Sequence, residues 1–248
     1  MQPWSFIKRS IMRVWYLHVG ALNKLWPSIT VGGKRLTTSP GVYKPLENEF
    51  ACAEYCRSGD RVLDLGCGSG VCSVFCAPNA REVIAVDISA AAVENTEENC
   101  KRLGIANVRV WQSDMFSRVD GKFDLILANA PYVSADFEDE KEQFATSVRY
   151  LPTLFAEVRE HLTGDGRLLV QFPIWFRGRI VGLASRNGLE VVSVRRLPRK
   201  SLGLSLLSLA YLQVGFRSAY FLIQPFPVES ETTRAVSAPT RKYAAAAR

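Results

Sequence analysis

A glycine-rich turn after an apolar segment constrains the fold of this chain more than any other feature. The apolar segment contains Asp64 and leads directly to three glycines in a GxGxG spacing, which are Gly66, Gly68 and Gly70. Glycines at a strand end let the backbone approach a ligand at the start of the following helix. Val71 stands where a dinucleotide-binding GxGxxG motif needs its third glycine, which weakens the case for a pyrophosphate ligand. We therefore predict a strand, a tight turn and a helix that together form a ligand site.

Around this turn the chain alternates predicted helices with short apolar strands. Strand interiors such as residues 83–86 and 125–128 are continuous apolar runs, which is typical of strands covered on both faces. Such alternation predicts an α/β fold with a parallel sheet and right-handed crossovers. The expected strands are residues 61–65, 82–87, 108–112, 123–128, 167–172, 189–195 and 219–223, and the expected helices are 48–57, 70–77, 90–103, 140–162 and 177–185.

The N-terminal region has a different pattern. Apolar residues recur at helical spacing as far as Leu25, with basic residues on the other side, which predicts an amphipathic helix. Gly20 is expected to bend or break this helix. Residues 28–38 then predict a small hairpin that turns at Gly32 and Gly33.

The net charge of +7 is unevenly distributed. Residues 1–35 carry six basic side chains and no acid, and residues 177–200 carry seven basic side chains against the single acid Glu190. Such asymmetry can mark contact with nucleic acid or an anionic surface. Solvated helix faces and strand edges are the favoured interpretation, because no aromatic-interleaved RNA-binding signature accompanies the charge.

The cysteines and histidines do not predict a metal site. Cys52 and Cys56, like Cys72 and Cys76, are four residues apart, which is a helical spacing, and the two histidines are isolated. Reduced thiols fit a cytoplasmic protein. Basic residues interrupt the N-terminal apolar segment, so no secretory signal is expected, and the uncharged stretch 201–216 is too short to span a bilayer. We expect a soluble cytoplasmic protein that makes no membrane contact.

Two carboxylates complete the predicted ligand site. Asp64 precedes the glycine turn, where its charge suits an ammonium group and not a pyrophosphate. Asp87 ends the next strand, 23 residues later, where it is placed to accept both hydroxyls of a ribose. A turn that merely needs small residues, with Asp87 capping the next helix, is the alternative. The two acids at this spacing favour the ligand site.

A second candidate site follows the fourth predicted strand. The run Asn129, Ala130, Pro131 and Tyr132 lies at the carboxyl end of that strand, where open α/β sheets bind ligands. The Asn129 side-chain oxygen and the Ala130 carbonyl can hold a planar NH₂ group so that its nitrogen lone pair points at an electrophile. Pro131 would stiffen the turn, and Tyr132 would stack on a planar group or lie over a cation. A simple strand-ending turn is the alternative.

These motifs resemble the class I S-adenosylmethionine-dependent methyltransferases over residues 43–173. The resemblance rests on VLDLGCGSG, VIAVDIS, SDMF and ANAPY, which begin at Val62, Val83, Ser113 and Ala128. It implies a Rossmann-like, seven-stranded, mostly parallel sheet with the last strand antiparallel and helices on both faces. It also implies that the chain binds S-adenosylmethionine.

The resemblance assigns the parts of that cofactor to individual residues. Asp64 and the Gly66 backbone would hold the methionine part, and Asp87 would hold the ribose. Ile88 would pack on the adenine, whose edge would meet Asp114 and Met115. The complete set of implied cofactor contacts is Tyr43, Asp64, Gly66, Gly68, Gly70, Asp87, Ile88, Asp114, Met115 and Asn129.

Two further segments point to a branch of the family. The NAPY run looks like the [D/N/S]PPY motif of enzymes that methylate exocyclic amines and amides, with Ala130 in place of a proline. Residues 42–47, VYKPLE, are similar to the V-Y-x-P-x-E segment of the protein-glutamine branch, although Asn48 and Glu49 replace its usual Asp-Thr. Asn48 is expected to cap its helix. The resemblance is closest to the NPPY-type, protein-glutamine or N-methyltransferase-like branch.

We therefore predict transfer of a methyl group to an amide or amine nitrogen by in-line displacement, with Asn129, Pro131 and Tyr132 as catalytic residues. The expected acceptor is a small molecule or a peptide, and nucleic acid is a less favoured partner. One alternative is a non-methylating enzyme that cyclises the aminobutyrate arm of the cofactor to an azetidine carboxylate and releases methylthioadenosine. Another is a non-catalytic RNA-binding subunit.

The chain is expected to divide into three parts. These are residues 1–47, an amphipathic helix and hairpin that cap the active site; residues 48–228, the S-adenosylmethionine-binding catalytic domain; and residues 229–248, a flexible tail. The tail is inferred from its Ser, Thr, Ala and Pro content without periodicity.

Overall fold

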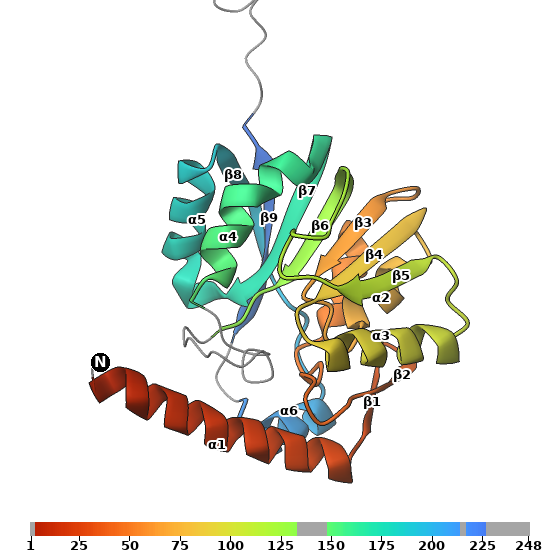
Figure 1. Cartoon of the computed structure of the whole chain (residues 1–248), viewed down its shortest axis with the longest axis vertical. Coiled ribbons are helices and arrows are strands. Elements are labelled where there is room, and N and C mark those ends of the chain that lie inside the picture. The colour runs from red at the N-terminus through yellow and green to blue at the C-terminus, as the bar shows by residue number, and fades with distance from the viewer. Residues whose placement is uncertain (1–2, 133–147, 214–216, 227–248) are drawn as a thin grey trace, which may run out of the picture.

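A seven-stranded sheet forms the centre of the computed structural model, which describes residues 3–132, 148–213 and 217–226 (Figure 1). The strand order is β5-β4-β3-β6-β7-β9-β8. All neighbouring strands are parallel except β9, which is antiparallel to both β7 and β8. The predicted Rossmann-like α/β fold with an antiparallel last strand is confirmed.

All seven expected strands are present. They are β3 (Arg61–Leu65), β4 (Glu82–Asp87), β5 (Val108–Gln112), β6 (Phe123–Asn129), β7 (Leu162–Pro173), β8 (Leu189–Arg196) and β9 (Ser218–Pro225). Side chains that alternate along a strand enter two different apolar clusters, one on each face of the sheet. In β3, Val62 belongs to one cluster and Leu63 to the other. This two-sided burial explains why the strands read as unbroken apolar runs.

Helices cover both faces of the sheet. The helices after β3 and β4 are α2 (Val71–Cys76) and α3 (Ala90–Arg102), and their buried residues Val74 and Cys100 belong to the cluster of Val62. The other face is covered by α4 (Tyr150–Glu157) and α5 (Arg177–Arg186), whose Leu154 and Ile180 belong to the cluster of Leu63. Short 3₁₀ helices are η1 (Glu49–Tyr55), η3 (Val158–His161) and η4 (Ile174–Phe176).

Three details of the predicted helices are corrected. The segment expected as a helix over 48–57 is the 3₁₀ helix η1. Asn48 adopts a left-handed conformation (φ 62°) and makes no side-chain cap; its amide instead donates to the carbonyls of Pro198 and Arg199, at 3.2 and 3.1 Å. The helix α6 (Leu202–Ala210) was not expected. The beginning of the helix predicted over 140–162 and the tail 229–248 lie outside the described residues.

The N-terminal region consists of one long helix and a hairpin. The helix α1 (Pro3–Leu25) continues through Gly20, so the predicted break is wrong. The helix is held on both sides of that glycine, because Val19 and Asn23 are fully buried. The predicted hairpin is confirmed: β1 (Ser28–Val31) pairs with β2 (Lys34–Thr37) around Gly32 and Gly33, which have φ values of 52° and 79°.

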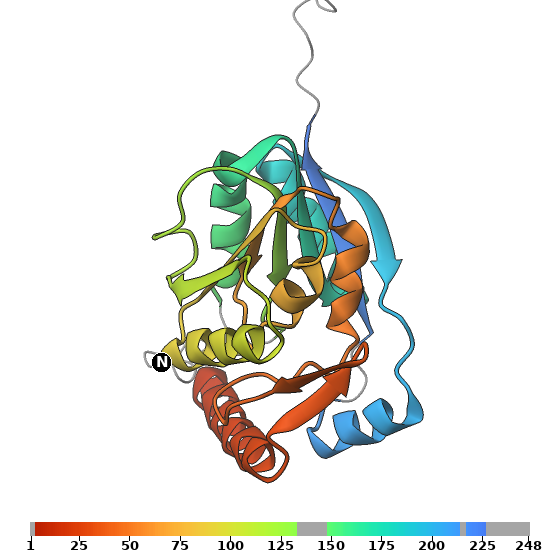
Figure 2. The same cartoon turned by 90° about the vertical axis from the view of Figure 1, so that its right-hand side faces the viewer.

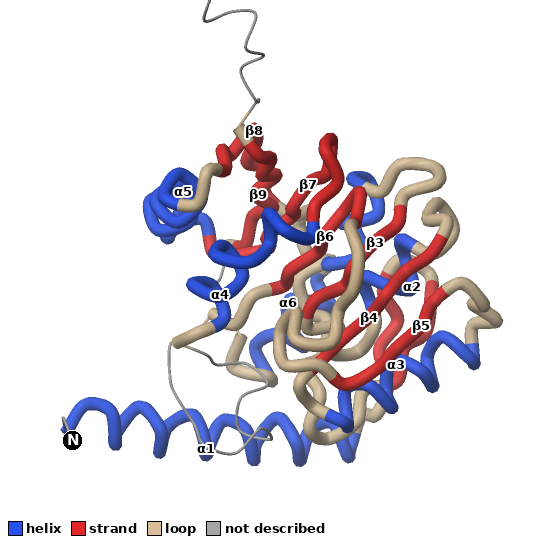
Figure 3. The backbone as a smooth tube through the Cα atoms, turned by 45° about the horizontal axis from the view of Figure 1, so that its top comes forward, coloured by secondary structure: helices blue, strands red, loops and turns tan. Residues whose placement is uncertain are grey.

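Polar contacts join α1 to the segment after the hairpin and to the residue that follows α6. The Asn23 amide donates to the carbonyls of Ser39 and Val42, at 2.9 and 2.8 Å, and its oxygen accepts the Tyr211 hydroxyl at 2.9 Å. As a result α1, the hairpin and α6 lie at one end of the molecule (Figure 2). The N-terminal end of α1 projects beyond the sheet (Figure 3). Among the described residues, no helix has the length and apolar character needed to cross a bilayer.

Candidate active site

A cavity of about 1290 Å³ lies at the carboxyl ends of β3, β4 and β6. The chain leaves β3 toward β4 on one side, whereas β6 lies on its other side, so this is the point where the strand order reverses. Ligands in open α/β sheets bind at such a point. Twelve of the residues that were predicted from the sequence to form the site line the cavity: Tyr43, Asp64, Gly66, Gly68, Asp87, Ile88, Asp114, Met115, Asn129, Ala130, Pro131 and Tyr132.

The three glycines of the turn have different functions. All have positive φ values, 80° at Gly66, 54° at Gly68 and 75° at Gly70, which other residues rarely adopt. Gly66 and Gly68 line the cavity, and a side chain at Gly68 would meet nothing within 4 Å. Gly70 does not line the cavity. A Cβ there would lie 2.8 Å from Cγ2 of Thr96, so Gly70 allows α2 to pack closely on α3.

Asp64 is a buried carboxylate at the cavity wall, with only 3% of its surface exposed. Its Oδ2 accepts hydrogen bonds from the backbone nitrogen of Ser73 at 2.9 Å and from the Ser73 hydroxyl at 2.6 Å. Burial raises the pKa of Asp64 to about 7, because the charged form has lost its water. A cation against this carboxylate would favour its charged form, which agrees with a site for an ammonium group.

Asp87 is oriented by two backbone donors. Its Oδ2 accepts from the Gly68 nitrogen at 3.0 Å and its Oδ1 from the Ser89 nitrogen at 2.9 Å. Burial raises the pKa of this carboxyl group. An ionised carboxylate has about four acceptor positions, so capacity remains for a pair of hydroxyls in the cavity. Asp87 also joins the glycine turn to the end of β4, which fixes the two parts of the site together.

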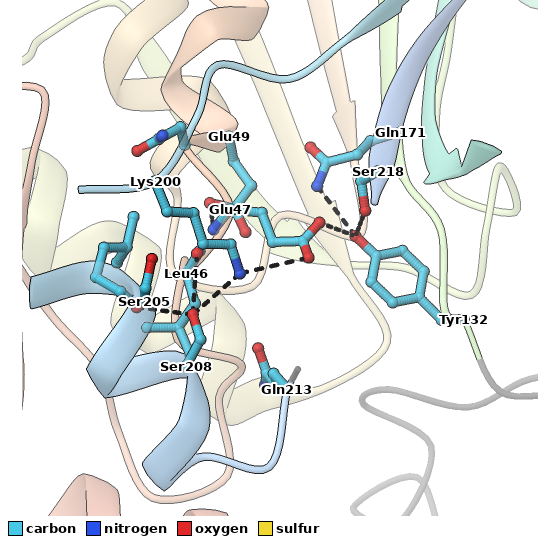
Figure 4. A network of polar contacts seen from close by, with 12 residues as sticks. Leu46, Glu47, Glu49, Tyr132, Gln171, Lys200, Ser205, Ser208, Gln213 and Ser218 are labelled. Atoms are coloured by element: carbon cyan, nitrogen blue, oxygen red, sulfur yellow. Dashed lines mark hydrogen bonds and ion pairs between the residues drawn. The ribbon is translucent and has the colours of Figure 1, made fainter. Parts of the chain in front are cut away.

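The Tyr132 hydroxyl takes part in a network of polar contacts that continues through Glu47 to Lys200 (Figure 4). This hydroxyl is 3.3 Å from Oε2 of Glu47 and 3.4 Å from Oδ1 of Asn129, and it accepts hydrogen bonds from Gln171 at 3.0 Å and Ser218 at 3.2 Å. Burial raises the pKa of Tyr132 well above its usual value. The hydroxyl is therefore neutral and held in place beside Asn129.

Two buried acids, Glu47 and Glu49, also line the cavity, and the sequence motifs assigned them no function. Oε1 of Glu47 is 3.7 Å from Nζ of Lys200. Oε2 of Glu49 accepts the Glu47 backbone nitrogen at 2.9 Å, whereas its Oε1 has no hydrogen-bond partner among the described residues. Burial, and then the charge of Glu47, raise the pKa of Glu49 to about 7. Glu47 ends the VYKPLE segment, which was the one signal for this pair.

Further cavity residues come from segments outside the glycine turn and the NAPY run. The half-buried Tyr43 donates its hydroxyl hydrogen to Oε1 of the buried Gln213 at 3.0 Å, and Gln213 follows the unexpected helix α6. The Tyr150 hydroxyl donates to the Leu65 carbonyl at 2.7 Å, directly before the glycine turn. Side chains of α1, including Trp15 and His18, line the cavity too.

The described residues include no group of three or more His, Cys, Asp or Glu side chains that could hold a metal ion. The six cysteines are buried and free. The carboxyl ends of the strands thus present carboxylates, backbone amides, and the Asn129 side chain beside the Tyr132 hydroxyl.

Residues 50–172 match the family model of the methyltransferase small domain. A protein of Methanocaldococcus jannaschii, whose name assigns it protein N5-glutamine methyltransferase activity, is 38% identical over 117 residues that cover 46% of this chain and 58% of the relative. Ribosomal RNA small subunit methyltransferase C of Chromohalobacter salexigens is 30% identical over 165 residues, which cover 60% of this chain and 47% of the relative. The chain belongs to the class I S-adenosylmethionine-dependent methyltransferases. It spans about half the length of these curated relatives.

Solved structures share the fold of this methyltransferase. A ribosomal protein L11 methylase from Lactobacillus delbrueckii subsp. bulgaricus has a TM-score of 0.56 and 21% identity, over 76% of this chain and 83% of the other. A methyltransferase in complex with S-adenosylhomocysteine has a TM-score of 0.57 and 16% identity, over 79% of this chain and 55% of the other. The cofactor of the methyltransferase is S-adenosylmethionine.

One expectation about partners is wrong. The sequence interpretation favoured a small-molecule or peptide acceptor over nucleic acid. The relatives and the fold neighbours are instead named for ribosomal RNA, ribosomal protein L11 and protein glutamine, which are macromolecular acceptors. Motifs at the cofactor site could not reveal this, because the same glycine turn and carboxylates serve any acceptor.

Proposed function

We propose that this methyltransferase modifies a planar nitrogen, an amide or an exocyclic amine, that belongs to a macromolecule such as ribosomal RNA or a ribosomal protein. The observation that carries the proposal is the position of Asn129 in the same cavity as Asp64, Gly68 and Asp87. Asn129, whose amide oxygen can accept a hydrogen bond from an NH₂ group, therefore lines the same cavity as the proposed cofactor residues.

The residues at the strand ends fit the parts of S-adenosylmethionine. Asp64 would bind the ammonium group, because its carboxylate is buried and has no cationic partner among the described residues. Asp87 would bind the ribose hydroxyls, and Ile88, Asp114 and Met115 would surround the adenine. When bound, the cofactor supplies the methyl group to be transferred. The remaining cofactor assignments are supported by their place in the cavity lining, and they are Tyr43, Gly66, Gly68 and Asn129. Gly70 acts through packing.

The acceptor residues act by positioning. Oδ1 of Asn129 and the carbonyl of Ala130 would accept the two hydrogens of the acceptor NH₂ group and turn its lone pair toward the methyl group. Tyr132 would keep the Asn129 side chain in place, because its hydroxyl lies 3.4 Å from Oδ1 and is itself held by Gln171 and Ser218. Pro131 lines the cavity between them. Nothing in the comparisons supports cofactor cyclisation or a non-catalytic subunit.

The N-terminal region would serve as a lid in this function. Side chains of α1 line the cavity opposite the strand ends, so residues 1–47 would cover an acceptor group once it has entered. Residues 48–228 would then form the catalytic domain. The flexible tail and the cytoplasmic location stay predictions.

To test the proposal, the protein is incubated with methyl-labelled S-adenosylmethionine and unmethylated ribosomal subunits. The RNA and the protein of the subunits are then separated. We expect the label in one of these fractions, with S-adenosylhomocysteine as the other product. Asn129→Ala should lose transfer by about a hundredfold or more, since positioning supplies much of the rate, and should keep its affinity for the cofactor. Release of methylthioadenosine, or equal loss of transfer and cofactor affinity in Asn129→Ala, would contradict the proposal.

A further inference from the structure

Exposed apolar side chains gather on α1 and α6. Ten of the sixteen large apolar side chains that are exposed among the described residues lie in residues 7–26 and 202–212, with exposed fractions of 45% to 78%. On α6 they form a stripe at helical spacing, and on α1 a second stripe faces away from the buried Val19 and Asn23. We call these ten residues the apolar platform: Ile7, Ile11, Val14, Leu17, Leu25, Trp26, Leu202, Leu206, Leu209 and Leu212.

The two stripes are parts of one surface. A ring nitrogen of His18 on α1 lies 2.8 Å from the carbonyl of Ala210 at the end of α6, and Nε1 of Trp15 donates to the carbonyl of Tyr211 at 3.1 Å. Ile11 and Leu212, one from each stripe, line the same cavity. Both helices lie at the same end of the molecule (Figure 2). Contiguous exposed apolar surface of this kind marks an interaction site.

The two segments that carry the platform are basic in sequence. Residues 1–46 contain seven basic residues and no acid, and residues 191–228 contain five basic residues and no acid. All 24 acidic residues of the chain lie outside these two segments. Lys24, Arg35 and Arg199 are among the exposed basic side chains. The occupant of the platform must therefore combine an apolar layer with negative charge.

We propose that the apolar platform binds the surface of an anionic lipid bilayer, with α1 and α6 lying in the plane of the interface. Helices that bind in this way combine an apolar stripe, flanking Lys and Arg, and Trp. Anionic headgroups attract the basic residues of these segments, while the Leu, Ile and Val side chains enter the acyl boundary. This differs from the sequence expectation that the protein makes no membrane contact, and it does not depend on the proposed acceptor.

Other occupants fit less well. A second copy would bring the basic, acid-free segments of two chains together, and like charges oppose such a contact. A nucleic acid would meet the basic residues, but nine of the ten platform side chains are aliphatic and offer no aromatic ring on which bases could stack. The lipid surface satisfies both the charge and the apolar area.

Vesicle co-sedimentation tests the proposal with the full chain. Wild type should bind vesicles of equal parts phosphatidylglycerol and phosphatidylcholine, should ignore vesicles of phosphatidylcholine alone, and should bind less as salt is raised. The triple variant Leu202→Ser, Leu206→Ser, Leu209→Ser should lower the partition coefficient by about tenfold or more. The matched control Trp175→Ser, Val181→Ser, Val192→Ser removes three exposed apolar side chains outside the platform and should bind like wild type.

Thermal unfolding and cofactor affinity, measured on all three proteins, show whether the variants fold. Absence of vesicle binding by wild type, or equal loss in both triple variants, would overturn the proposal. A wild-type dimer that only the platform variant converts to monomer in light scattering would make the platform a self-interface. Binding of a single-stranded RNA oligonucleotide that the platform variant loses, without vesicle binding by wild type, would make it a nucleic-acid surface. Either result would identify a different partner for the platform and overturn the proposal of a lipid surface.

Discussion

At the scale of single residues, Asp64 couples the cofactor site to pH. Burial raises its pKa from 3.8 to about 7, so the folded protein binds this proton more tightly than the unfolded chain does. The stability that Asp64 contributes is therefore fully present below the unfolded pKa and is lost as the pH rises through about 7. In the proposed function cofactor binding has the opposite preference, because an ammonium group at Asp64 would need the charged carboxylate.

We therefore expect the affinity for S-adenosylmethionine to fall as the pH is lowered through about 7. The dissociation constant should rise by at most about tenfold per pH unit below that value, since one proton is involved. Titration calorimetry between about pH 8 and pH 5.5 measures this. Asp64→Asn should bind more weakly at high pH and show a flat profile. If the variant keeps the wild-type profile, another group is responsible, and Glu49, with a pKa of about 7, is the next candidate.

At the scale of elements, the strands could be predicted because each is buried on both faces. In β3, β4 and β5 the predicted and observed ends agree, since a short apolar run with polar flanks leaves little choice of bounds. The helix α6 was missed because its leucines and serines carry no charge that would define a polar face. Its one local signal is Ser201, whose hydroxyl accepts the Leu204 nitrogen at 3.2 Å as a helix cap.

The predicted break at Gly20 failed for a related reason. Glycine weakens a helix by backbone entropy alone, at about 1 kcal/mol relative to alanine, and burial of the neighbouring Val19 and Asn23 outweighs that cost. A pattern read along the chain does not include such tertiary packing.

The cost of a glycine inside α1 leads to a prediction. Gly20→Ala should raise the free energy of unfolding by up to about 1 kcal/mol, because the new Cβ would lie 3.5 Å from the Pro40 carbonyl, an ordinary contact. Urea denaturation measures the change. Gly41→Ala is the matched control, since its Cβ would lie only 3.1 Å from the Tyr16 hydroxyl and should bring no gain. A loss of stability in Gly20→Ala would mean that α1 does not pack through this position as described.

At the scale of the whole molecule, the two halves of the cavity differ in how far the sequence reveals them. The half that we propose for the cofactor comes from consecutive strand ends, so spacing alone could place Asp64, Gly68 and Asp87 in the cavity. The acceptor half is assembled from distant segments, for example Glu47 before the sheet and Ser218 in its last strand, which meet only at the Tyr132 hydroxyl. No local pattern links such residues, so the contacts around the Tyr132 hydroxyl could not be predicted, although Asn129 and Tyr132 themselves were predicted for this site.

The same division predicts how ligand binding changes global stability. A ligand at a hundred times its dissociation constant stabilises the folded state by about 2.7 kcal/mol. For a chain of 248 residues this corresponds to a rise of about 5–10 °C in the thermal midpoint. We expect this rise with S-adenosylhomocysteine for wild type and for Asn129→Ala, whose substitution lies in the acceptor half.

Asp87→Ala should behave differently, because it removes the carboxylate that joins the glycine turn to the ribose position. At the same ligand concentration its thermal midpoint should shift by less than half of the wild-type value. Its midpoint without ligand shows whether the variant folds. Scanning calorimetry measures all three proteins. Equal shifts in Asp87→Ala and wild type would mean that the ribose is held elsewhere, and a smaller shift in Asn129→Ala would show that the two halves of the cavity share the cofactor. The comparison therefore separates residues that bind the cofactor from residues that orient the acceptor within a single cavity.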